Sequence, residues 1–125
     1  FNEQISTYGF EDGFFGYEIS QHTPITYIDN PLIHAGVRNN QDYLAKTDEL
    51  CATLVKLYFS DQKETLLKVS KLARHVHYLH RLHLCGLVAY CFKPHKTRMV
   101  QNLCSPTPRL RNLDLYKLGT ACSLL

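Results

Sequence analysis

The chain has 125 residues, of which 45% are hydrophobic and 20% are charged, a balance typical of a folded chain rather than a disordered one. Its five cysteines are an odd number and include no Cys-x-x-Cys pair, which argues against a disulfide framework or a zinc ribbon and for reduced thiols in the cytoplasm. No apolar run approaches the roughly 20 residues that span a bilayer.

The two halves of the chain carry opposite charge. Residues 1–61 hold three Lys and Arg against nine acids, which gives −6, whereas residues 62–125 hold eleven Lys and Arg against two acids, which gives +9. A basic second half predicts an anionic partner, and the candidates are lipid headgroups, nucleic acid or an acidic surface of the same protein.

The first third of the chain is predicted to be loop, short helix and strand. Residues 1–16 are rich in Gly and aromatic residues and lead into a helix that should end near Gln21, where Thr23-Pro24 breaks it. Residues 25–28 are apolar and β-branched, which predicts a strand. One strand cannot form a sheet alone, so we expect its partner strands, and the rest of the domain, to lie outside this chain.

The rest of the chain is predicted to be helical. Asn39 is a suitable N-cap for a helix whose apolar residues recur at three-to-four spacing as far as Tyr58. A long helical pattern then runs from Thr65 to about Phe92. After a break at two prolines, a last short helix is expected over Leu110–Leu118, with Gly119 as its C-cap. The predicted fold is therefore mostly α with a minor β component, divided into residues 1–38 and a helical region over 39–125.

The densest chemical motif is Tyr8-Gly-Phe-Glu-Asp12, two adjacent carboxylates in a loop of glycines and aromatic rings. One carboxylate could act as a general base toward a hydroxyl, and aromatic faces could support a sugar ring. The alternative is structural, because two acids at the start of a helix are stabilised by the helix dipole.

The stretch from Tyr8 to Tyr17, followed by Ile28-Asp-Asn-Pro-Leu-Ile-His34, resembles the acceptor-side region of bacterial family-2 glycosyltransferases with the GT-A fold. The ending Asp114-Leu-Tyr-Lys-Leu-Gly119 is similar to the C-terminal tail of bacterial members. The resemblance implies the C-terminal segment of a GT-A α/β nucleotide-sugar transferase of cell-envelope polysaccharide synthesis, followed by a helical extension.

Carried over by position, the resemblance implies that Asp12 is the catalytic base and that Glu11 binds the acceptor hydroxyls. The acceptor subsite would be lined by Tyr8, Gly9 and Phe10. His34 matches the position of a metal-binding histidine, where Mn²⁺ or Mg²⁺ would neutralise the leaving diphosphate. The other interpretation of His34 is a loop residue bonded to a backbone carbonyl.

The Asp-x-Asp element that such enzymes need for the nucleotide-sugar is missing from these 125 residues. We therefore expect the chain alone to be inactive, to hold no metal and to self-associate through unpaired surfaces. The complete enzyme would transfer a sugar from a nucleotide-sugar, with inversion, to a glycan or lipid-linked acceptor.

Four histidines, His75, His77, His80 and His83, are spaced along one predicted helix. The i, i+3 pairs could share a metal, but a solvated, mildly basic face fits the spacing better, with His83 as a hydrogen-bonded core histidine. Farther on, a basic tail interleaved with apolar residues suits an interfacial helix on anionic lipid or an ordinary solvated surface. No motif supports nucleic-acid binding.

The rival function is a non-enzymatic helical module that binds an acidic partner or a membrane surface through residues 62–125. Either function predicts a cytoplasmic protein, peripheral at the inner face of the plasma membrane if the basic tail binds lipid.

Overall fold

The structure, a computed structural model, describes residues 9–26, 28–29, 31 and 39–125. This part of the chain is mostly helical. Its elements in chain order are α1 (Glu11–His22), α2 (Asn40–Tyr58), α3 (Lys63–Val69), α4 (Lys71–Arg81), α5 (Cys85–Phe92), the 3₁₀ turn η1 (Lys93–His95), α6 (Lys96–Leu103) and α7 (Leu110–Ser123).

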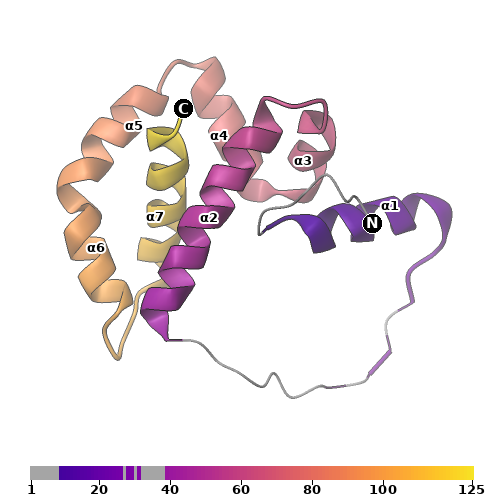
Figure 1. The fold of residues 1–125 in the computed structure, drawn as a ribbon, viewed down its shortest axis with the longest axis horizontal. Helices are drawn as coiled ribbons and strands as arrows, with labels where there is room; N and C mark the ends of the chain where they lie inside the picture. Colours follow the sequence, from indigo (N-terminus) through magenta and orange to yellow (C-terminus); the bar gives the residue numbers. More distant parts are fainter. Residues whose placement is uncertain (1–8, 27, 30, 32–38) are drawn as a thin grey trace.

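The C-terminal helix α7 is the centre of the arrangement. It contacts α2, α4, α5 and α6, while α1 packs on α3 at the other side of α2. In Figure 1, α5 and α6 form an arc along one edge of the molecule and α1 lies at the opposite edge. The second half of the chain therefore wraps around its own last helix.

Two hydrophobic clusters hold these helices together. The larger is formed mainly by α2, α3, α4 and α7, and its fully buried members include Leu54, Leu66 and Val76. The smaller joins α2 to α5, α6 and α7 around Phe92 and Tyr116. The chain thus buries its apolar stripes among its own helices, and the prediction of a mostly α fold is confirmed.

The predicted N-cap of α2 is confirmed. The side chain of Asn39 accepts a hydrogen bond of 2.8 Å from the backbone N–H of Asp42, which satisfies one of the free amides at the start of the helix. The predicted end of α1 is also correct, since the helix stops at His22, just before Thr23-Pro24.

The single long helix predicted from Thr65 to Phe92 is wrong, because the chain forms three shorter helices there. Ser70 has extended backbone angles and its hydroxyl accepts from the N–H of Ala73, so it ends α3 and caps α4. His83 has a φ of 56°, a left-handed conformation that separates α4 from α5. The apolar periodicity continues across both breaks, which is why the pattern concealed them.

The predicted strand over residues 25–28 is also wrong. Ile25, Thr26 and Ile28 belong to no strand, and none occurs in the described part of the chain. Ile25 is 51% exposed and Ile28 is 79% exposed, so neither side chain is buried against a sheet. A β-branched run gains its stability from neighbouring strands, and no described segment pairs with this one.

Gly119 was predicted to be the C-cap of the last helix. It instead lies inside α7 and is buried. A Cβ on this residue would lie 2.8 Å from Cδ1 of Phe92 and closer still to two other atoms of the ring. The glycine therefore lets α5 approach α7, because any larger residue would collide with Phe92.

Candidate functional site

The Glu-Asp motif forms the first turn of α1. Phe10 precedes the helix in a left-handed conformation with φ 72°, which costs roughly 1–2 kcal/mol for a residue with a Cβ. The carboxylate of Glu11 accepts a 2.9 Å hydrogen bond from the N–H of Gly9, so it closes the turn that enters the helix. This is the arrangement expected for acids at a helix start.

The other predicted site residues are placed differently. Asp12 is exposed at the start of α1, Gly9 is buried against Leu50, and Phe10 packs on the larger hydrophobic cluster. Tyr8 and His34 lie outside the described residues. The catalytic, acceptor-binding and metal-binding roles therefore stay predictions.

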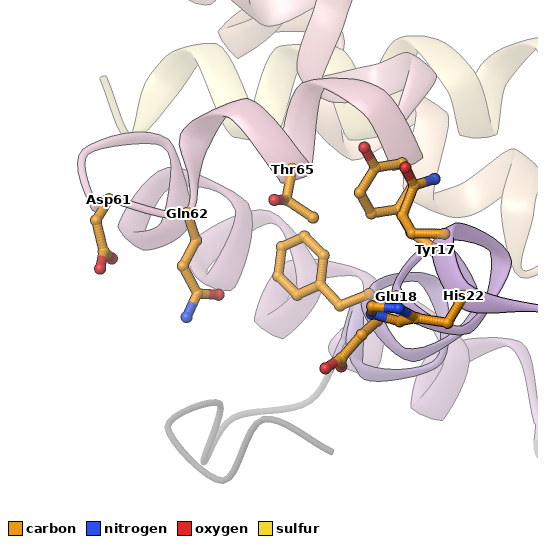
Figure 2. A pocket seen from close by; sticks show the side chains of 8 residues that line it. Tyr17, Glu18, His22, Asp61, Gln62 and Thr65 are labelled. Carbon is orange, nitrogen blue, oxygen red and sulfur yellow. The ribbon is translucent and has the colours of Figure 1, made fainter.

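A groove of about 510 Å³ runs between α1 and the start of α3. Figure 2 shows Glu18 and His22 of α1 on one side of it and Asp61 and Gln62 on the other. Phe14 and Thr65 also line it, whereas neither Glu11 nor Asp12 does. The groove is acidic and open, so it could hold a polar or cationic group in contact with solvent.

The predicted solvated face of α4 is confirmed for His75 and His80, which are exposed, whereas His77 is half-buried. Tyr58 of α2 is 3% exposed, and its hydroxyl lies 2.9 Å from Nδ1 of His77 and 3.3 Å from Nδ1 of His80. A phenol has one proton, so it donates to one imidazole and accepts from the other. Desolvation, and next the charges of Lys63 and Arg81, lower the pKa of His77, which favours its neutral form.

His77 and His80 are therefore hydrogen-bond partners of the Tyr58 hydroxyl. His83 was predicted to be a core histidine. It is exposed instead, because its left-handed backbone turns the chain out of α4. Among the described residues no group of three or more His, Cys, Asp or Glu could hold a metal ion. Sequence alone missed Tyr58, although a tyrosine on an apolar helix stripe does signal that its hydroxyl needs a partner.

The basic part of the chain is unusually free of acids. Between Glu64 and Asp114 there is no Asp or Glu, while the same stretch carries nine Lys and Arg and five His. The one ion pair found among the described residues is Lys46–Glu49, within α2. The positive charges of α4 to α6 are therefore not neutralised by carboxylates of the described chain.

Helix α5 is apolar on both faces. Its inner side, with Cys85 and Phe92, is buried against α7, while Leu87 and Tyr90 on the outer side are 59% and 77% exposed. Leu84, one turn earlier, continues this outer side and is 38% exposed. A helix that is hydrophobic all round is normally covered on all sides, so the outer face of α5 is a surface with an unfilled contact.

No family model matches this chain, and neither the curated proteins nor the solved structures include a significant match. Among the described helices, none is both long and apolar enough to cross a membrane.

Proposed function

We propose that this chain is a helical module that attaches to an anionic membrane surface through α5 and the basic turns that follow it. The observation that carries the proposal is the exposed apolar face of α5 beside positive charge that no carboxylate pairs with among the described residues; the Lys96 ammonium also lies 5.7 Å from the centre of the Tyr116 ring. Leu84, Leu87 and Tyr90 form the apolar part, and Lys93 and Lys96 form the basic part; we call these five residues the α5 surface.

A lipid surface satisfies both parts of the α5 surface at once. Aliphatic side chains enter the boundary between headgroups and acyl chains, a tyrosine prefers the same boundary, and lysines pair with anionic headgroups. A nucleic acid would neutralise the lysines but would offer no apolar phase to Leu84 and Leu87. Lipid therefore accounts for every member of the surface.

The expected affinity is moderate. Each Lys near an anionic leaflet contributes about 1 kcal/mol. Burying the exposed part of Leu87 contributes roughly 1–2 kcal/mol, and Tyr90 a similar amount. The sum of about 4–6 kcal/mol supports reversible attachment. It also makes the binding sensitive to salt, since the lysine contributions fall as the Debye length shortens.

Vesicle co-sedimentation tests the proposal. Binding to phosphatidylcholine vesicles should appear when phosphatidylserine is added and should weaken strongly between low salt and about 0.5 M. Leu87→Gln with Tyr90→Gln should lower partitioning about 10-fold or more, because two inserted side chains become polar. Ile25→Gln with Ile28→Gln is the matched control, since it removes two exposed apolar side chains elsewhere.

Two outcomes would contradict the proposal. One is equal pelleting, or none, with neutral and anionic vesicles. The other is a dimer in sedimentation equilibrium that Leu87→Gln/Tyr90→Gln dissociates, because a second copy would then cover the outer face of α5. That result would instead support the predicted self-association.

The acceptor-side transferase is a second proposal, favoured by one observation. Glu11 and Asp12 open α1, the position that the resemblance to family-2 glycosyltransferases implies, and the open groove follows the same helix. In the full-length protein that contains this chain, Asp12→Asn should lower sugar transfer by roughly 10²–10⁴ and leave donor affinity unchanged. Asp42→Asn, the same change at an exposed position on α2 outside the groove, is the control, and equal turnover in the Asp12→Asn and wild-type proteins would reject this role.

A further inference from the structure

A separate hollow of about 330 Å³ lies between α6 and the start of α7. Its lining is basic and polar and contains no carboxylate. The residues around it are His95, Arg98, Met99, Asn102, Arg109 and Asn112. Two arginines and a histidine, all three exposed, thus line one open hollow that contains no carboxylate.

The floor of this cavity is fixed by Asn102. Its side-chain oxygen accepts hydrogen bonds from the backbone N–H of Arg109, at 3.2 Å, and from the side-chain amide of Asn112, at 2.7 Å. The backbone oxygen of Asn102 also accepts from the hydroxyl of Ser105, at 2.6 Å. These bonds hold the end of α6 against the start of α7, so Arg98 and Arg109 project from a scaffold that is already ordered.

The start of α7 is electrostatically unsatisfied. Arg109 is its N-cap residue and makes no capping hydrogen bond with its side chain, and the first turn contains no acid. Arg111 adds a second positive charge there. A helix N-terminus carries a partial positive charge, so cations at this end are unfavourable and a bound anion would stabilise it, although the N–H groups of Arg109 and Asn112 already bind Asn102 and the Arg109 carbonyl.

We infer that this cavity binds a phosphate group, carried either by a lipid headgroup or by a small soluble phosphoester. Guanidinium groups form paired hydrogen bonds to phosphate oxygens, and two of them match a doubly charged phosphomonoester better than a single carboxylate. His95 supplies a third hydrogen-bond donor to the phosphate, and the partial positive charge at the start of α7 also favours the bound anion. The lipid form of this inference rests on the proposed function, whereas the soluble form does not.

The first test uses soluble probes. Inorganic phosphate and glycerol 3-phosphate should shift amide NMR signals of residues 95–112, and sodium chloride at equal ionic strength should not. Arg98→Gln with Arg109→Gln should weaken this binding at least 10-fold. Lys71→Gln with Arg74→Gln removes the same charge from α4, outside the cavity, and should leave binding within about two-fold.

The second test distinguishes the two sources. Phosphatidylcholine vesicles containing phosphatidic acid, a phosphomonoester, are compared with phosphatidylserine vesicles of the same surface potential. A preference for phosphatidic acid that Arg98→Gln/Arg109→Gln removes supports the headgroup source. Soluble binding without this preference supports the soluble phosphoester and rejects the lipid form. The absence of both soluble phosphate binding and a preference for phosphatidic acid would overturn the inference.

The two proposals can fail separately. Loss of all vesicle binding with soluble phosphate binding intact rejects membrane attachment and keeps the phosphate site. Vesicle binding that depends on Leu87 and Tyr90 but is indifferent to Arg98 and Arg109 keeps membrane attachment and rejects the site.

Discussion

The contact between Gly119 and Phe92 gives the sharpest test of the packing. Gly119→Ala places a methyl group against three atoms of the Phe92 ring, one at 2.8 Å and two closer. Alanine would favour the helix by about 1 kcal/mol, but overpacking of this kind costs typically 1–3 kcal/mol, and here the methyl meets a ring that is itself buried. Subtracting the helix gain from this cost leaves an expected net loss of up to about 2 kcal/mol of unfolding free energy.

Urea denaturation followed by circular dichroism measures this loss. Gly16→Ala is the matched control, because Gly16 also lies inside a helix and a Cβ there meets nothing within 4 Å. That variant should gain up to about 1 kcal/mol from helix propensity alone. The two alanine substitutions should therefore change stability in opposite directions.

A double-mutant cycle locates the cause. Phe92→Leu should be destabilising alone, because it leaves a cavity beside α7, but it should recover part of the loss in the Gly119→Ala background. If Gly119→Ala stabilises the protein as Gly16→Ala does, the close approach of α5 to α7 is refuted.

Two further predictions concern buried polar groups and thiols. Tyr116 is 2% exposed, and its hydroxyl donates to both carboxylate oxygens of Asp48, at 2.9 and 3.2 Å. Tyr116→Phe should therefore lower the unfolding free energy by about 1–3 kcal/mol, measured by urea denaturation. Tyr90→Phe, at an exposed position, is the control and should change it by almost nothing. Burial raises the pKa of the Cys51 thiol to about 11, and burial with the neighbouring Cys85 raises that of Cys122 to about 12. Both should therefore stay protonated at pH 8 and resist iodoacetamide, while exposed Cys91 is alkylated first; mass spectrometry showing equal labelling would contradict this burial.

The sequence predicted the features that depend on local chemistry. Asn39 caps α2 because its side chain reaches an amide three residues away, and α1 ends at Thr23-Pro24 for reasons of local sterics. Such signals involve only neighbouring residues, so they can be found without knowing the fold.

The errors concern residues whose partners are distant in the chain. Gly119 resembles a helix end, and only the position of Phe92 shows that its missing side chain is needed for packing. Residues 25–28 have strand composition, but a strand depends on pairing that composition does not show. Likewise, the hydroxyl that binds His77 and His80 comes from Tyr58, on another helix.

The charge division along the chain is in part a division in space, although Lys63 and Lys68 of the basic half lie on α3 beside α1, and this gives the molecule a preferred orientation. Helix α1 contains three carboxylates and no Lys or Arg, and it lies at the edge of the molecule opposite α5 and α6 in Figure 1. An anionic surface attracts α5 and α6 and repels α1, so the field would turn the molecule before contact. The α5 surface and the cavity containing Arg98 and Arg109 belong to the same basic edge, whereas the acidic groove along α1 would face water. Membrane attachment would therefore leave that groove free for a second, soluble ligand.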